Sequence, residues 1–136
     1  MKTAILILAY GAPDSLADVE PFYTDIRRGS PPPPELLEEL IGRYKAIGGK
    51  SPLLEITRRQ AAALGERMGG EFKVYVGMRH WSPWIAETVK EMADDGIEEA
   101  VAIVMAPHYS SMSIEKYKEH VNAGNAALGS PIQFHF

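Results

Sequence analysis

The chain has 136 residues, which is enough for one domain that buries roughly two-thirds of its unfolded surface. Apolar residues make up 46% and charged residues 24% of it, as in a folded globular protein and unlike a disordered chain. The net charge of −4 argues against general nucleic-acid binding, and the absence of cysteine excludes disulfides, thiolate nucleophiles and iron–sulfur clusters.

The first half of the chain is predicted to form one strand followed by three helices. Residues 4–9 are an uninterrupted apolar run, which is typical of a strand covered on both faces. Helices are predicted over 18–28 and 35–46, and the proline-rich residues 30–34 form a rigid connector between them, with an SH3-type ligand as the weaker interpretation. A third helix is predicted over 51–68, where a Ser-Pro pair supplies the N-cap and paired glycines end the helix.

The second half of the chain is predicted to alternate strands with helices. Strands are predicted at 72–76, 100–105 and 131–136, the middle one again buried on both faces. Helices are predicted over 82–96, where a second Ser-Pro pair repeats the cap, and over 113–126. Such alternation gives right-handed crossovers and a parallel sheet. The predicted fold is therefore a Rossmann-like, three-layer α/β/α domain with a four-stranded parallel sheet.

In such a sheet, ligands bind beyond the carboxyl ends of the strands. Tyr10 ends the first strand, and its phenol is expected either to project into this crevice or to pack at the sheet edge. A single glycine follows it where a dinucleotide fingerprint needs three, so nucleotide binding is not expected. Large flat or soft side chains that suit a flat apolar ligand gather near the strand ends, although at least half are expected to be core. They are Met78, Trp81, Trp84, Tyr109, Met112 and Tyr117.

Histidines also follow the strands. His80 and His108 are each expected at a strand end, and two histidines at neighbouring ends indicate a metal or anion role better than one does. No carboxylate accompanies them at a ligand-like spacing, so a closed metal site is not predicted. His120 and His135 are expected to be incidental.

Basic side chains lie at helix ends near the predicted crevice. Arg27 and Arg28 either stabilise a helix C-terminus or form a fork for substrate carboxylates. Arg43 and Tyr44 precede a Gly-Gly turn by one helical turn, so they are expected to reach the same region as Ser51.

Five motifs, in order along the whole chain, resemble the ferrochelatase family, in particular its bacterial coproporphyrin type. They lie at residues 8–13, 23–29, 43–53, 77–83 and 106–110. The resemblance implies a lyase of haem biosynthesis that inserts ferrous iron into coproporphyrin III or protoporphyrin IX. It implies no further cofactor, and a chelatase-like fold of two similar lobes with the porphyrin held between them. Residues 1–136 match the N-terminal lobe only, so we expect the C-terminal lobe to be absent from this chain.

The resemblance also implies roles for individual residues. Tyr10 would be the axial ligand of the porphyrin iron, and His80 is a candidate metal relay near the cleft. The porphyrin and its propionates would be held by Arg27, Arg43, Tyr44, Ser51 and Tyr117, with Tyr23, Ile26 and Arg28 on the same wall.

The family's metal-binding histidine and glutamate belong to the second lobe, so we expect these residues alone to bind porphyrin weakly and to be a poor catalyst. The partners expected are porphyrin, ferrous iron, and the second lobe or a second copy of the chain. One alternative is a small homodimeric chelatase, although the small cobalt chelatases place a histidine where this chain has Tyr10. Another is a non-catalytic porphyrin or haem carrier. Residues 4–9 are too short for a signal peptide or a transmembrane helix, so a cytoplasmic location is expected.

Overall fold

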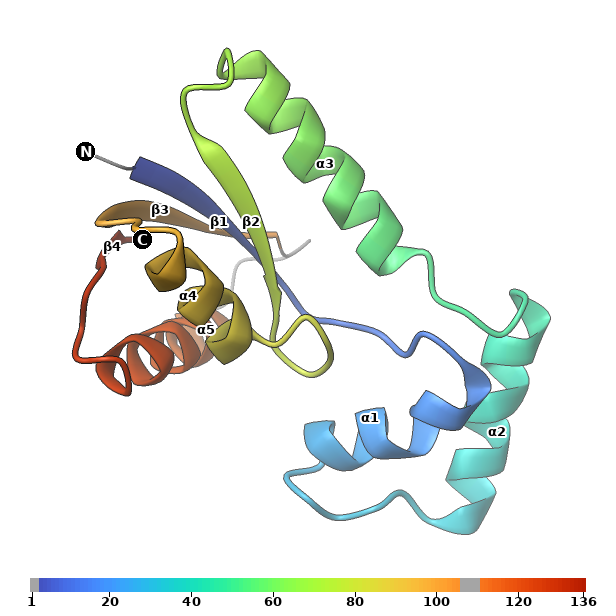
Figure 1. The fold of residues 1–136 in the computed structure, drawn as a ribbon. Coiled ribbons are helices and arrows are strands. Elements are labelled where there is room, and N and C mark those ends of the chain that lie inside the picture. The colour runs from blue at the N-terminus through green and yellow to red at the C-terminus, as the bar shows by residue number, and fades with distance from the viewer. Residues whose placement is uncertain (1–2, 106–110) are drawn as a thin grey trace.

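A computed structural model of the chain describes residues 3–105 and 111–136 and shows a four-stranded, fully parallel sheet (Figure 1). The strands are β1 (Thr3–Ala9), β2 (Lys73–Met78), β3 (Glu99–Val104) and β4 (Gln133–His135). Their order across the sheet is β2-β1-β3-β4, so β1 lies inside the sheet and pairs with both β2 and β3. The predicted α/β class and all-parallel sheet are confirmed.

Three helices cover the two faces of the sheet. They are α3 (Leu53–Arg67), α4 (Ile85–Asp94) and α5 (Ser111–Ala126). The crossover from β1 to β2 carries α3, whereas the next two crossovers run in the opposite direction across the sheet and carry α4 and α5. Because parallel crossovers are right-handed, reversal of direction moves the helices to the other face. In Figure 1, α4 and α5 accordingly lie on one side of the sheet and α3 on the other.

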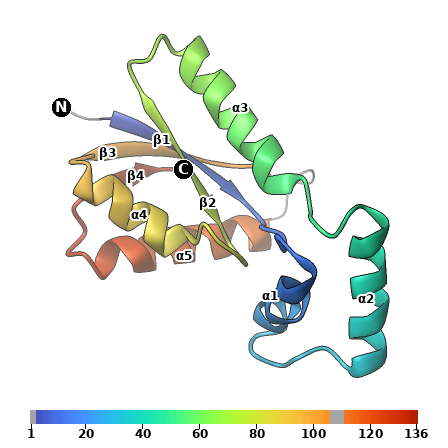
Figure 2. The same cartoon turned by 45° about the vertical axis from the view of Figure 1, so that its right-hand side comes forward.

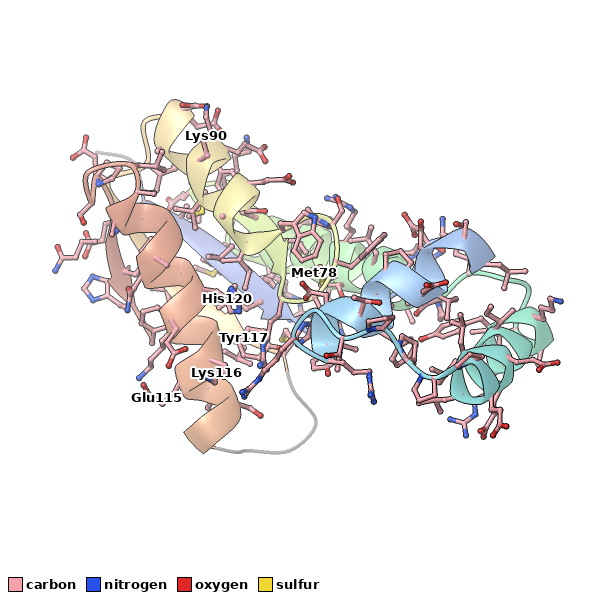
Figure 3. All side chains as sticks on the ribbon, turned by 90° about the horizontal axis from the view of Figure 1, so that it is seen from below. Met78, Lys90, Glu115, Lys116, Tyr117 and His120 are labelled. Carbon is pink, nitrogen blue, oxygen red and sulfur yellow. The ribbon has the colours of Figure 1, made fainter. Side chains whose placement is uncertain are left out.

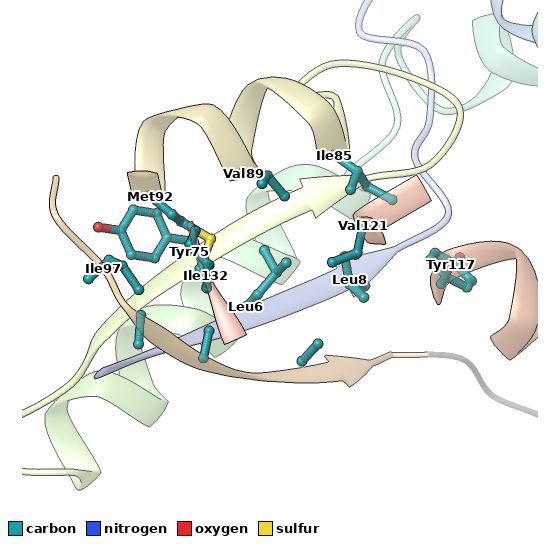
Figure 4. Packing of buried hydrophobic residues seen from close by; sticks show 13 residues of the cluster. Leu6, Leu8, Tyr75, Ile85, Val89, Met92, Ile97, Tyr117, Val121 and Ile132 are labelled. Atoms are coloured by element: carbon teal, nitrogen blue, oxygen red, sulfur yellow. The ribbon is translucent and has the colours of Figure 1, made fainter. Parts of the chain in front are cut away.

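The larger core lies between the sheet and the α4–α5 pair (Figure 4). Leu6 and Leu8 of β1 are fully buried there against Val89 of α4 and Val121 of α5. The alternate residues of β1, including Ile7, point to the opposite face and pack against α3. The uninterrupted apolar run of the first strand is thus explained by helices on both faces.

The prediction for the third strand is wrong in detail. Residues 100–105 were expected to be buried on both faces, but Val101 and Ile103 of β3 are exposed, at 43% and 38%. They point to the face of α3, and that helix packs over β2 and β1. In β2, Tyr75 is 4% exposed in the α4–α5 core, whereas Val74 and Val76 face α3.

The helix starts differ from the predictions where Ser-Pro pairs were interpreted as caps. Helix α4 begins at Ile85, and Ser82 does not cap it. Instead, the Pro83 carbonyl accepts a hydrogen bond from the Met78 amide (2.6 Å), which holds residues 79–83 as a loop against β2. At α3, Ser51 Oγ does accept a hydrogen bond from the first helical amide, that of Leu53 (3.2 Å).

The two remaining α-helices stand beyond the carboxyl end of the sheet and cover neither face (Figures 1 and 2). They are α1 (Val19–Ile26), preceded by a 3₁₀ turn at Leu16–Asp18, and α2 (Pro34–Ala46). On the predicted apolar stripe of α2, only Leu40 is buried, because that helix packs against α1 and the 3₁₀ turn. Among the described residues, no helix combines the length and apolar character that a bilayer span needs.

Tyr75 makes the stability of this core sensitive to alkaline pH. Burial, with a hydrogen bond from its hydroxyl to Asp95 (2.6 Å), raises the pKa of Tyr75 to about 12. A raised pKa in the folded state means that stability is complete below the unfolded value of 10.0 and falls as the pH rises towards 12. We expect Tyr75→Phe to lower the free energy of unfolding at neutral pH by about 1 kcal/mol, through the lost hydrogen bond. It should also flatten the decline above pH 10 in urea-unfolding curves; an equally steep decline in the variant would contradict this assignment.

Candidate functional site at the carboxyl ends of the strands

The chain turns out of β1 at Tyr10 and Gly11, beside the loop that follows β2. Gly11 has a φ of +98°, and a Cβ there would lie 3.0 Å from the Trp81 backbone nitrogen. The Arg79 amide donates to the Ala9 carbonyl (3.0 Å) and the His80 amide donates to the Tyr10 carbonyl (2.9 Å). These bonds extend the β1–β2 pairing past the strands, and they fix Tyr10 beside His80.

The ring of Tyr10 packs against two other aromatic rings and remains partly exposed. Its ring centroid lies 4.6 Å from that of His80 and 6.4 Å from that of Phe22, both in edge-on orientation. The residue is nevertheless 42% exposed. Partial burial raises the pKa of Tyr10 above 10.0, although the Arg79 charge opposes the shift, so the phenol is neutral at pH 7. An exposed phenol whose ring packs against neighbouring side chains fits both alternatives for Tyr10, projection into the crevice and packing at the sheet edge.

His80 has a carboxylate partner that the spacing of the sequence did not reveal. Its Nδ1 lies 2.8 Å from Oδ2 of Asp25, 55 residues earlier in the chain, on α1. His80 is 8% exposed. Burial lowers its pKa below 6.5, and the hydrogen bond to Asp25 only partly opposes the shift, so the imidazole is neutral at pH 7. Asp25 therefore connects α1 to the end of β2 through a buried histidine.

The hydroxyl groups of Tyr23 on α1 and Tyr44 on α2 lie 3.4 Å apart. Burial, together with this hydrogen bond, raises the pKa of Tyr44 far above its usual range. Arg43, its neighbour on α2, is exposed and forms an ion pair with Glu39 (2.6 Å). Ser51 lies near the turn after β1, since its amide donates to the Pro13 carbonyl (3.3 Å). The structure thus joins Tyr23 to Tyr44, and it leaves Arg43 paired with a carboxylate of its own helix.

Arg27 and Arg28 follow α1 and are exposed. Within the described ranges, neither guanidinium forms an ion pair. Arg28 has a φ of +58°, and its amide and that of Gly29 bond back to carbonyls of α1. Ile26, the last residue of α1, is half-buried. The end of α1 therefore carries two cations that are free to pair with an anionic ligand.

No role was predicted for Arg79 from the sequence, but in the structure its charge acts on the pKa values of Tyr10 and His120. Its guanidinium carbon lies 5.7 Å above the ring of Tyr117, and its Nε is buried without a hydrogen-bond partner among the described residues. Tyr117 is 3% exposed, and burial raises its pKa to about 12. Its expected contact with a porphyrin remains a prediction, because the structure places it mainly in the core.

His120 shares this electrostatic environment and is less isolated than the sequence indicated. It lies with Tyr117 on the side of α5 that faces the rest of the domain, whereas Glu115 lies on the outer side (Figure 3). Partial burial lowers the pKa of His120 below 6.5, and the charge of Arg79, with that of His80 once it is protonated, lowers it further.

A metal centre is not formed by the side chains of residues 3–105 and 111–136, since no three carboxylates or histidines there are placed to hold an ion. The expected pairing of His80 with His108 is wrong in one respect: β2 and β3 are not neighbours, because β1 lies between them. His108 and Tyr109 themselves lie outside the described residues. Trp81 and Trp84 contact each other (5.9 Å between ring centroids) and line an open groove of ≈ 630 Å³ that also includes Asp25.

Comparison with known proteins gives one family and a consistent set of relatives. The ferrochelatase family model matches residues 2–136. A coproporphyrin III ferrochelatase 2 of Bacillus cereus is 48% identical over 136 residues, covering 96% of this chain and 43% of the relative. Coproporphyrin III ferrochelatase of Geobacillus kaustophilus is 49% identical with the same coverage, and the ferrochelatase of Deinococcus radiodurans is 48% identical over 88% of this chain. The chain spans less than half the length of each of these relatives.

Proposed function

This chain belongs to the ferrochelatase family, and from that premise we propose that it forms one wall of a porphyrin site in a protein that inserts ferrous iron into a porphyrin of haem biosynthesis. The observation that carries the proposal is the exposed phenol of Tyr10 at the end of the central strand β1. Its ring packs against those of His80 and Phe22, and the family model matches residues 2–136. A phenol held in this way suits an axial oxygen ligand for the iron of the product. The coproporphyrin III named for the relatives is the substrate we propose.

The cations of α1 support binding of a carboxylated macrocycle. The chain carries a net charge of −4, so an anionic porphyrin needs a local positive region. Arg27 and Arg28 supply it, because they are exposed and unpaired within the described residues. Arg43 can join them only by leaving Glu39, an exposed ion pair that costs little to break. Tyr23, Tyr44, Ile26 and Ser51 complete this wall in our proposal, with Tyr117 beneath it and His80 as the metal relay.

The chemistry of insertion also needs a base for the two pyrrole protons. His80 is neutral and could accept one proton, but its Nδ1 is engaged with Asp25. A general base must lie within hydrogen-bond reach of its proton. We therefore propose that the 136 residues alone bind porphyrin and insert metal poorly, and that the remainder of the family's length supplies the base and the second wall.

Replacement of Arg27 tests the proposed porphyrin wall. We expect Arg27→Met to weaken binding of coproporphyrin III about tenfold or more in fluorescence titrations, because a charge-assisted hydrogen bond to a propionate is worth about 1.5–3 kcal/mol. The matched control is Arg67→Met, which removes the same charge from the last turn of α3. A coproporphyrin with esterified carboxylates should bind the wild type and Arg27→Met equally. Failure of the wild type to bind either porphyrin would overturn the proposed function.

A further inference from the structure

The carboxylate of Asp25 and the imidazole of His80 form a pair in which one side chain is buried and the other is exposed. The His80 side chain is 10% exposed, whereas the Asp25 side chain is 42% exposed at the groove lined by Trp81 and Trp84. The pair joins two parts of the fold that are far apart in sequence, α1 and the loop after β2. Asp25 thus contacts the groove as well as His80, and His80 in turn contacts the ring of Tyr10.

The geometry restricts the proton arrangement on the ring. An ionised carboxylate only accepts hydrogen bonds, so a neutral His80 that bonds to Oδ2 of Asp25 through Nδ1 must carry its proton on Nδ1. The opposite nitrogen, Nε2, is then unprotonated, and no described residue hydrogen-bonds to it. Rotation of the ring to exchange the two nitrogens is restricted, since the side chain is buried and its ring lies edge-on to the Tyr10 ring.

The same arrangement is the usual support for a metal-binding histidine, whose second nitrogen donates to a carboxylate that fixes tautomer and ring orientation. We propose that Asp25 is a positioning residue, which holds His80 in the Nδ1–H tautomer so that the bare Nε2 is available to a divalent metal ion on its way to the porphyrin. The metal role rests on the proposed function, whereas the tautomer assignment rests on the geometry alone. A single nitrogen suits transient contact, in keeping with the lack of a three-ligand site among the described residues.

The tautomer is measured directly by ¹⁵N-histidine NMR of the full 136-residue chain at about pH 8, where neutral imidazole prevails. The His80 signals are assigned from their loss in His80→Gln. In the wild type we expect His80 to show a protonated Nδ1 and an unprotonated Nε2. In Asp25→Ala, which leaves no acceptor for the Nδ1 proton, we expect the Nε2–H tautomer to become the major form.

The matched control is Glu20→Gln, which removes a carboxylate from the same helix and the same groove without touching His80. It should leave the tautomer unchanged. Circular dichroism of each variant establishes that it is folded, and Asp25→Glu, which keeps an accepting carboxylate, should restore the Nδ1–H form in part or in full. An Nε2–H wild type, or a tautomer unaffected by Asp25→Ala, would overturn the proposal.

Porphyrin titration of the same samples separates this inference from the proposed function. A wild type that shows the Nδ1–H tautomer but does not bind coproporphyrin III would refute the porphyrin role and leave the positioning of His80 by Asp25 in place. A wild type that binds porphyrin but shows the Nε2–H tautomer would refute only the role of Asp25.

Discussion

Tyr10→Phe is expected to abolish the tyrosinate-to-iron charge-transfer absorption in a complex of this chain with ferric coproporphyrin III. The phenol oxygen is the only heavy atom that the substitution removes, and it is the iron ligand in the proposed site. Phenylalanine keeps the ring that packs against His80 and Phe22, so the fold should be retained. Loss of one coordinate bond should also weaken iron-porphyrin binding, whereas metal-free porphyrin has no iron to ligate and its binding should be nearly unchanged.

The matched control for this experiment is Tyr23→Phe. Tyr23 lies on the same wall, but its hydroxyl bonds to that of Tyr44. We expect this variant to retain the charge-transfer band of the wild type. If Tyr10→Phe retained the band and Tyr23→Phe lost it, the iron ligand would be Tyr23 and the proposed orientation of the porphyrin would be wrong.

The largest expected effect on stability is that of Leu6→Ala. Leu6 is fully buried in the interior strand β1, in the core beneath α4 and α5. Truncation to the β-carbon leaves a cavity in a region held by strands on both sides, so we expect the free energy of unfolding to fall by about 3–4 kcal/mol. That is a large part of the stability of a domain of this size.

Urea unfolding followed by circular dichroism measures this change. The midpoint should fall while the slope with urea stays that of the wild type, because the folded structure is otherwise preserved. Leu36→Ala is the matched control: this leucine is 36% exposed on α2, away from the sheet, and its loss should cost less than about 1 kcal/mol. Equal losses in the two variants would show that the α4–α5 core does not dominate stability.

The sheet and the site's location were predictable from the sequence because both follow from local patterns. The apolar run ending at Tyr10 identified the central strand, and alternation of strands with helices identified the parallel sheet and its carboxyl edge. Such patterns report the burial of a segment but do not say what covers it. That is why β3 was predicted to be covered on both faces, although Val101 and Ile103 lie beyond the reach of α3.

The electrostatic partners could not be predicted, because they depend on contacts between distant segments. Asp25 and His80 were both inside motifs that carried the family resemblance, yet nothing in a 55-residue separation indicates a 2.8 Å contact. Arg79 was likewise one residue of a motif, and its importance follows from the burial of its Nε and its place over Tyr117. A search for charged residues directly after the predicted strands would have found Arg79, but not Asp25.

The position of α1 and α2 outside the sheet has a consequence for how this wall can change during evolution. Both helices are carried by the β1–β2 crossover and cover neither face of the sheet (Figure 2). The ring of Phe22 and the carboxylate of Asp25 connect α1 to the loop after β2. Insertions, deletions and substitutions in this helical pair can therefore accumulate without disturbing the strands. Changes in the helical pair that keep the contacts of Phe22 and Asp25 with this loop should therefore leave α1 in place beside the strand ends.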